Sequence, residues 1–141
     1  MKIVVDTNVL VAGLLSPFGA CAEIVRMTSS GELTLYFDAR ILSEYREVLC
    51  RAKFRFDIDR VVVLLEHIEH RGHIVSASLL SSPLPDPADE PFLEIAVAVQ
   101  AACLVTGNRA HFPSKLCQGV SVFSPSDFLR FYRKQQKKKD G

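Results

Sequence analysis

Three carboxylates of the chain stand at positions from which they could act together on a metal ion. Asp6 directly follows the apolar run Ile3–Val5, Glu44 lies within a helical pattern, and Asp89 precedes the apolar stretch 92–102. No histidine or cysteine adjoins any of them in the sequence. Carboxylate oxygens suit hard cations such as Mg²⁺ and Mn²⁺, and clustered acids repel one another when no cation is bound. These residue types therefore predict a hard-metal site, provided that the fold brings the three acids together.

Asp6 stands at the junction of a predicted strand and a predicted helix. Ile3, Val4 and Val5 are apolar and β-branched, which is typical of a strand buried on both faces of a parallel sheet. Polar residues follow, and apolar residues then resume at helical spacing over 9–15. Open α/β sheets bind ligands at the carboxyl ends of their strands, which is where this junction places Asp6. The alternative is that Asp6 only caps the following helix.

Helical spacing predicts where the other two acids point. Glu44 lies about 100° from the centre of the apolar stripe of its helix, at the border of core and solvent, whereas Glu47 is nearly opposite the stripe. Asp89 shares a helical face with Phe92, and Glu94 lies about 140° away from it. Glu44 and Asp89 are therefore the better candidates for a buried site. The simpler alternatives are a solvated flank for Glu44 and a helix cap for Asp89.

Strand-like and helix-like patterns alternate along the chain. Apolar or β-rich runs predict strands at 3–5, 33–37, 73–75, 103–105 and 120–123. Apolar residues at helical spacing predict helices at 9–15, 18–28, 41–49, 57–71, 92–102 and from 124 onward. The alternation predicts an α/β fold of three layers (α/β/α) with a central parallel sheet of about five strands. Right-handed crossovers then bring the residues just after the first, second and fourth strands, and the loop before the helix at 92–102, to one crevice.

Length and charge predict one domain with a basic extension. The 141 residues suit a single core, and we predict one domain over residues 1–133. Residues 134–141, with three consecutive lysines at 137–139, are predicted to form a disordered basic tail. A solvated tail is the simpler interpretation of this charge, and contact with phosphates is the alternative. The net charge of +1 gives no overall signature of nucleic-acid binding.

Cysteine usage and hydropathy predict a cytoplasmic protein. The four cysteines are scattered without the spacing of a zinc site or of a disulfide framework, which favours a reducing compartment. The apolar run at the N-terminus is too short for a signal peptide. No stretch approaches the roughly 18 apolar residues that a membrane span requires. We therefore expect no membrane contact.

Segments around the acids resemble the motifs of PIN-domain nucleases. The opening Val-Val-Asp-Thr-Asn looks like the family signature, and residues 42–49 are similar to the segment with its second acid. Residues 86–96 are similar to the segment D-P-x-D-x-x-F-L-x-x-A that holds its third acid, and residues 105–113 resemble the T-G-[DN] segment. The closing Val-Phe-Ser-Pro-Ser-Asp-Phe-Leu resembles VapC-like toxin components of toxin–antitoxin systems. The resemblance extends over nearly the whole chain.

This resemblance implies a metal-dependent endoribonuclease that hydrolyses phosphodiester bonds of single-stranded RNA. It makes Asp6, Glu44 and Asp89 the metal-binding and catalytic acids, with Thr7 and Asn8 as polar supports. The cofactor would be Mg²⁺ or Mn²⁺, which lowers the pKa of a bound water and offsets charge on the phosphate. The implied partners are RNA, an antitoxin protein and a second copy of the chain in a homodimer.

The fourth motif departs from the pattern. Many PIN domains have an aspartate at or shortly after this position, where this chain has Asn108 and His111. Asn108 could support a metal-bound water or a phosphate but carries no charge. Three acids therefore remain, which argues against a tightly held second metal. Basic residues are predicted to contact RNA, namely Arg51, Lys53, Arg55, Arg109 and the C-terminal lysines.

Two further functions compete with the nuclease. The missing fourth acid makes a catalytically weak or inactive PIN-like module, which binds nucleic acid or protein, the main alternative. A phosphoacceptor or nucleotide-binding α/β domain also places an acid after its first strand. The chain contains neither G-x-G-x-x-G nor G-x-x-x-x-G-K-[ST], which disfavours that class.

Overall fold

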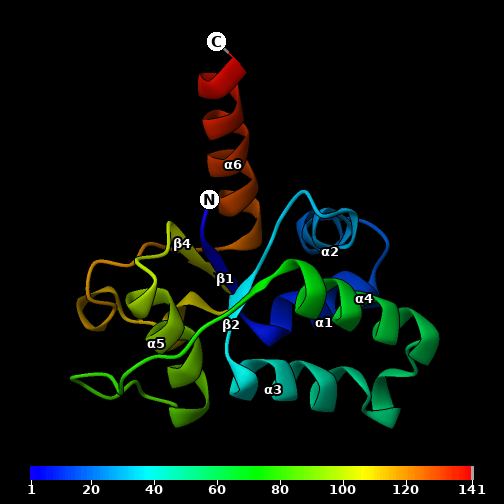
Figure 1. Cartoon of the computed structure of the whole chain (residues 1–141), viewed down its shortest axis with the longest axis horizontal. Helices are drawn as coiled ribbons and strands as arrows, with labels where there is room; N and C mark the ends of the chain where they lie inside the picture. The colour runs from blue at the N-terminus through cyan, green and yellow to red at the C-terminus, as the bar shows by residue number, and fades with distance from the viewer. Residues whose placement is uncertain (141) are drawn as a thin grey trace.

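Two apolar runs of the sequence form the centre of the sheet in the computed structural model, which describes residues 1–140 (Figure 1). Strand β1 (Ile3–Val5) pairs in parallel with β4 (Cys103–Val105), and Val4 lies opposite Leu104. All six residues of the two strands are fully buried. Burial on both faces explains why these segments are continuously apolar rather than alternating.

The strands are all parallel, and the shortest ones lie at the edges. The sheet through β1 has the order β1-β4-β5, and β2 pairs with β3 separately. A single parallel bridge between Ile3 and Leu35 links β1 to the chain just before β2. The hydrogen-bonded sheet around β1 is therefore smaller than the predicted five strands. The remaining bounds are β2 (Tyr36–Phe37), β3 (His73–Ile74) and β5 (Val122–Phe123).

Helices cover both faces of the sheet, as predicted. Figure 1 shows α5 on one side of β1, and α1, α2 and α4 on the other. Helix α5 packs against β1, β2 and β4, whereas α3 contacts α1, α4 and α5, which belong to both helical layers. This confirms the α/β fold with a parallel sheet flanked by helices. The helices are α1 (Thr7–Leu15), α2 (Ala20–Ser30), α3 (Ala39–Leu49), α4 (Ile58–Arg71), α5 (Glu90–Ala98) and α6 (Pro125–Asp140).

Several predicted boundaries shift for local reasons. Helix α5 ends at Ala98 instead of 102, because Gln100 adopts a left-handed backbone with φ 52°. It begins before Pro91, which the first turn of a helix tolerates because the missing N–H has no partner there. Only Tyr36–Phe37 of the strand predicted at 33–37 forms a ladder.

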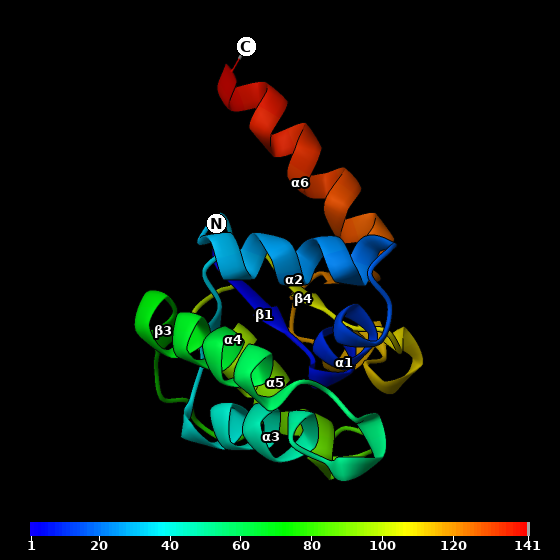
Figure 2. The same cartoon turned by 90° about the vertical axis from the view of Figure 1, so that its right-hand side faces the viewer.

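The C-terminal segment is a helix rather than the disordered tail that we predicted from residue 134. Helix α6 continues to Asp140, and the expected tail thus lies in the helix except for residue 141, which is outside the described residues. Lys, Arg and Gln are good helix formers, and lysines in the last turn interact favourably with the helix dipole. Figures 1 and 2 show that α6 projects away from the rest of the molecule.

The cysteines differ in burial, and the apolar helices are short. Cys103 and Cys117 are buried, whereas Cys50 is exposed at the end of α3. Across residues 1–140, no single helix is long and apolar enough to cross a membrane. Helices α1 and α2 meet that test only together, as a pair bent by 102°.

Candidate metal centre

Asp6 is fixed between the two central strands. Its N–H donates a hydrogen bond to the Val105 carbonyl (2.8 Å), and its Oδ2 accepts one from the Thr106 hydroxyl (2.9 Å). The residue occupies the N-cap position of α1, but its carboxylate accepts from Thr106 rather than capping the first turn. Only 6% of Asp6 is exposed. The direct side-chain hydrogen bond of Asp6 thus runs to Thr106, while the backbone amides of Thr7 and Asn8 lower the pKa of its carboxyl group.

Thr7 and Asn8 connect Asp6 to its surroundings. The buried Thr7 hydroxyl donates a hydrogen bond to Glu44 Oε2, so the first residue of α1 holds the acid of α3. Asn8 Oδ1 accepts a hydrogen bond from the Gly107 N–H (3.0 Å), which ties α1 to the loop after β4. Both residues thus orient the segments that carry the acids.

Helix α3 brings Glu44 to the end of β1. Asp38 caps the helix by accepting a hydrogen bond from the Ile41 N–H (2.9 Å). The hydroxyl of the fully buried Tyr45 donates to the Val5 carbonyl, which fixes α3 against β1 one residue before Asp6. Glu44 is half-buried, as its border position predicted. Its attachment to Thr7 and the contact of the next residue with β1 explain why it lies beside Asp6.

Asp89 precedes α5 and faces inward. It closes a short 3₁₀ turn, Pro87–Asp89, which Asp86 caps by accepting a hydrogen bond from the Ala88 N–H (2.9 Å). Asp89 is 9% exposed, and its Oδ2 lies 3.0 Å from Nδ1 of His111. Its carboxylate is turned to His111 rather than to the first turn of α5. Asp86 forms the turn before Asp89 and also lies next to this pair.

The three predicted acids raise one another's pKa. Burial is the largest cause for each of Asp6, Glu44 and Asp89. Repulsion by the Asp89 carboxylate further raises the pKa of Asp6, Asp6 raises that of Glu44, and Glu44 raises that of Asp89. Hydrogen bonds from Thr106 and Thr7 offset part of this effect on the pKa of Asp6 and of Glu44. Negative charge thus gathers in a poorly solvated place, where a divalent cation would relieve the repulsion.

The tightest group of metal-ligand atoms differs from the predicted trio. Within residues 1–140, Asp86, Asp89 and His111 are the acids and histidine whose ligand atoms all lie within 4.8 Å of one another. Asp6 and Glu44 belong to no group that converges so closely. In the sequence, Asp86 and Asp89 are three residues apart, and His111 lies three residues after Asn108, the position where many PIN domains have their fourth acid. Neither signal was sufficient to predict that the two segments meet.

Asn108 is linked to Asp6 through Thr106, whereas the basic residues predicted to contact RNA interact with other side chains or are exposed. Asn108 is exposed, and its backbone N–H donates to the Thr106 hydroxyl (3.0 Å) that in turn donates to Asp6. Three of these four basic residues interact with other side chains of the chain. Arg51 forms a two-pronged ion pair with Glu47, Arg109 pairs with Asp127 (3.2 Å), and Lys53 Nζ lies 5.0 Å from the ring centre of Phe54. Arg55 is exposed.

An ion pair between a half-exposed arginine and a buried glutamate joins α3, the helix of Glu44, to α5, the helix that follows Asp89. Glu94 of α5 is 4% exposed, and its Oε1 lies 2.7 Å from the guanidinium of Arg40 in α3. The same guanidinium contacts Asp38 at 2.7 Å. The sequence showed Glu94 only as a polar residue in an apolar helix. Its partner lies more than fifty positions away, so no local pattern could have identified the pair.

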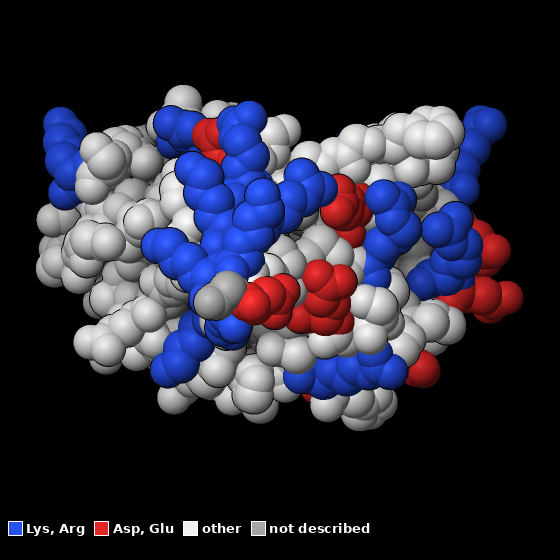
Figure 3. Space-filling view, turned by 90° about the horizontal axis from the view of Figure 1, so that it is seen from above, with Lys and Arg blue, Asp and Glu red and all other residues white. Residues whose placement is uncertain are grey.

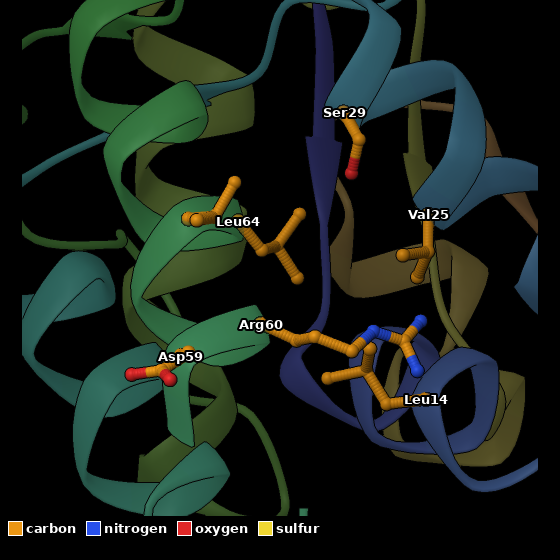
Figure 4. Close-up of a pocket in the computed structure, with 7 residues that line it drawn as sticks. Leu14, Val25, Ser29, Asp59, Arg60 and Leu64 are labelled. Atoms are coloured by element: carbon orange, nitrogen blue, oxygen red, sulfur yellow. The ribbon is translucent and has the colours of Figure 1, made fainter. Parts of the chain in front are cut away.

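One apolar pocket is lined by none of the predicted site residues. It has a volume of about 290 Å³ and lies between α1, α2 and α4 (Figure 4). Its lining consists of Leu14, Val25, Ser29, Asp59, Arg60, Val63 and Leu64. Figure 4 shows Arg60 extending from α4 toward Leu14. The acids and this pocket are therefore separate features of the surface.

Comparison with known proteins gives one family match. The family model described as the PIN domain matches residues 2–110, which include all three predicted acids and Asn108. No curated protein matches the chain.

Proposed function

Because the chain belongs to the PIN-domain family, we propose that it is a divalent-metal-dependent endoribonuclease that hydrolyses phosphodiester bonds of single-stranded RNA. PIN domains are generally metal-dependent nucleases, which supports the class of reaction. The observation that carries the proposal is the mutual repulsion of three poorly solvated acids from three separate segments, Asp6, Glu44 and Asp89. Their oxygen ligands suit Mg²⁺ or Mn²⁺.

The proposed roles follow from the contacts of each acid. Asp6 and Asp89 would hold the cation, and Glu44 would complete the set or position the attacking water. When bound, the cation lowers the pKa of its water and offsets charge on the phosphate. Thr106 fixes one oxygen of Asp6 and Thr7 fixes one of Glu44, so the other oxygens are available to ligands. Such supporting hydrogen bonds orient metal ligands in many sites.

We also propose that exposed basic residues contact the RNA backbone. Arg51, Lys53 and Arg55 lie just after α3, the helix of Glu44, and the positive charge of Arg51 lowers the pKa of Glu44. Arg109 could exchange its exposed pair with Asp127 for a phosphate, because exposed ion pairs contribute little free energy.

The toxin role, an antitoxin partner and a homodimer are further proposals. The first two depend on the resemblance of the closing residues to toxin components. Exposed apolar side chains support a protein partner, which could be an antitoxin or a second copy; among them are Leu15, Phe18, Ile58, Val62 and Val63. Light scattering of the purified chain would measure the dimer. A cytoplasmic location stays a prediction.

Cleavage of a mixed pool of single-stranded RNA tests the nuclease. We expect the wild type to cut the pool with Mg²⁺ or Mn²⁺ and to stop when the metal is chelated. Asp6→Asn and Asp89→Asn should lose at least about 100-fold in rate while retaining their circular dichroism, because each removes a charged ligand. Glu66→Gln is the matched control, since Glu66 is an exposed acid on α4.

The same experiment separates the nuclease from an inactive binding module. Asn108, in place of a fourth acid, is the observation that favours the module. RNA binding without metal-dependent cleavage in the wild type, or cleavage that persists in Asp6→Asn, would reject the proposed nuclease mechanism.

A further inference from the structure

We propose that Arg40 is a positioning residue, which sets where α3 holds Glu44 relative to Asp89 at the start of α5. This role rests on the proposed function, in which Glu44 and Asp89 act on the same cation. Arg40 belongs to α3, and its guanidinium reaches Glu94 of α5. The ion pair therefore joins the two helices that present these acids.

The ion pair lies little more than one helical turn from each acid. Glu44 follows Arg40 by four residues, and Asp89 precedes Glu94 by five. At 1.5 Å per residue, these separations are about 6 Å and about 7.5 Å along the helix axes. Because a hydrogen-bonded helix is stiff over so short a length, a displacement of α5 at Glu94 would move Asp89 by a similar amount.

The guanidinium of Arg40 has two acidic partners. One of its terminal nitrogens, Nη1, lies 2.7 Å from Glu94 Oε1, and its Nε donates a hydrogen bond to Asp38 Oδ2 (2.7 Å). Asp38 in turn caps α3, because its Oδ1 accepts a hydrogen bond from the Ile41 N–H (2.9 Å). A guanidinium is planar and its donors diverge at fixed angles, so it holds both acids in one geometry. Helix α5 is thereby tied to the first turn of α3.

Apolar packing alone restrains the two helices less strictly. The ring centres of Tyr45 in α3 and Phe92 in α5 lie 6.3 Å apart, at an interplanar angle of 38°. Burial of apolar surface is non-directional, so it opposes separation of the helices more than sliding. The two-point contact of an arginine with carboxylates adds geometric specificity. The ion pair therefore supplies the restraint on direction that the ring contact lacks.

The burial of Glu94 indicates a role other than stability. Only 4% of the residue is exposed, and its neighbours Leu93 and Ile95 are fully buried. Removing a carboxylate from water is costly, and an ion pair in such a place is often no more stable than apolar side chains of similar volume. Buried charges can instead select one arrangement of the elements that they join. The arrangement selected here places Glu44 and Asp89 at one site.

Binding of Mn²⁺ to Arg40→Met/Glu94→Met, called the Met variant below, tests this role without measuring activity. Both replacements are unbranched and apolar, and together they leave the net charge of the chain unchanged. We expect the circular dichroism and the melting temperature to stay close to those of the wild type. The affinity for Mn²⁺ should fall at least about tenfold, as when other supports of metal ligands are removed. Calorimetric titration measures the affinity, and electron paramagnetic resonance counts free Mn²⁺ independently.

The matched control removes an ion pair that joins α3 to a different helix. Arg46 of α3 lies 3.9 Å from Glu69 of α4, and both side chains are half-exposed. Arg46→Gln/Glu69→Gln should bind Mn²⁺ as tightly as the wild type does. A second variant, Glu94→Asp, keeps the charge but shortens the side chain by one methylene group, so that α5 must shift or the contact must break. Its affinity should lie between those of the wild type and the Met variant.

The outcomes distinguish this role from the proposed function. Weaker Mn²⁺ binding by a folded Met variant, with wild-type affinity in the control, supports the role of Arg40. If the wild type binds Mn²⁺ and the folded Met variant binds it equally well, or the control loses as much affinity, Arg40 is not a positioning residue although the metal site stands. If the Met variant does not fold, Glu94→Asp decides by the same comparison. If the wild type binds no Mn²⁺, both the role and the proposed metal site are wrong.

Discussion

At the scale of single residues, the three acids are arranged for ligand binding at a cost to stability. Burial and neighbouring carboxylates raise the pKa of Asp6, Glu44 and Asp89 above the ordinary value. A raised pKa means that the folded chain binds these protons more tightly than the unfolded chain. The charged acids therefore reduce the free energy of unfolding above the raised pKa values, and this loss disappears as the pH falls through them.

The first prediction concerns Asp6→Asn without metal. At pH 7 the variant should melt about 3–5 °C above the wild type, the shift expected for roughly 1 kcal/mol in a chain of this length. The difference should shrink as the pH falls, and it should vanish below about pH 3, where the wild-type acid is protonated in both states. Added Mn²⁺ should raise the melting temperature of the wild type more than that of the variant. Thermal melts followed by circular dichroism measure each value.

A difference in melting temperature that does not change with pH would contradict this account, because the effect would then not come from the charge of Asp6. Glu66→Gln, which removes an exposed acid on α4, should show no comparable stabilisation at pH 7.

A second prediction concerns the hydroxyl of Thr7. Thr7→Val keeps the shape of the side chain but removes the donor to Glu44, so Glu44 should lose its orientation. We expect RNA cleavage to fall about 10–100-fold, as when other supports of metal ligands are removed. Thr7→Ser keeps the hydroxyl and should cleave at a rate close to that of the wild type. Equal rates in Thr7→Val and Thr7→Ser would show that the hydrogen bond has no catalytic role.

At the scale of elements, the central strands were the most predictable part of the fold. Strands β1 and β4 are buried on both faces, and their apolar runs showed this directly. The edge strands β3 and β5 were also predicted. Because β3 is exposed and β5 is half-buried, their apolar patterns do not define where each strand begins and ends. The end of α5 depends on the left-handed backbone of Gln100, which no apolar pattern reveals.

The candidate site was predictable only where a local pattern carried it. Asp6 follows a buried strand and Glu44 lies at the border of a helical stripe, so both could be proposed from neighbouring residues. The meeting of Asp86 with His111 depends on how two loops fold against each other. The Arg40–Glu94 pair likewise joins distant segments. Such contacts between distant segments have no signature in one sequence.

A third prediction tests the packing of α1 on α2. Gly13 lies in α1, where alanine normally stabilises a helix by about 1 kcal/mol relative to glycine. A Cβ at this position would lie 2.6 Å from the Cys21 carbonyl oxygen and 2.5 Å from Cγ2 of Val25. Overlap with backbone cannot be relieved by a rotamer change, so we expect Gly13→Ala to lower the free energy of unfolding by about 1–3 kcal/mol.

Urea denaturation measures this effect. The neighbouring Ala12 is exposed, and Ala12→Gly should lose about 1 kcal/mol through helix propensity alone. If Gly13→Ala were more stable than the wild type, α1 and α2 would not pack as closely as the structure indicates.

At the scale of the whole molecule, the three predicted acids and the free end of the basic helix α6 lie at opposite ends. Asp6 follows the carboxyl end of β1, whereas α6 projects past the N-terminus of the chain (Figure 1). Viewed from above, Lys and Arg side chains gather over α6 (Figure 3). A helix of this length extends about 24 Å, so its last turn is far from the acids. The exposed basic residues of α6 are Arg130, Arg133, Lys134, Lys137, Lys138 and Lys139.

A fourth prediction separates affinity from chemistry. Replacing Lys137, Lys138 and Lys139 together by Gln keeps good helix formers and removes three charges. Cleavage of a short oligonucleotide should be unchanged, because these residues are remote from Asp6. Binding of a long single strand should weaken, and the slope of log affinity against log salt should fall by about 2, or roughly 0.7 for each phosphate contact. An unchanged slope would show that the lysines do not contact RNA.

The central claim is that Asp6 and Asp89 hold a divalent cation, and anomalous diffraction from crystals soaked in Mn²⁺ tests it most directly. We predict an anomalous peak about 2 Å from carboxylate oxygens of both residues, which is the usual bond length for such ions. The peak should be absent in Asp6→Asn crystals soaked in the same way. A wild-type map with no Mn²⁺ bound to Asp6, whichever other positions are occupied, would contradict the claim.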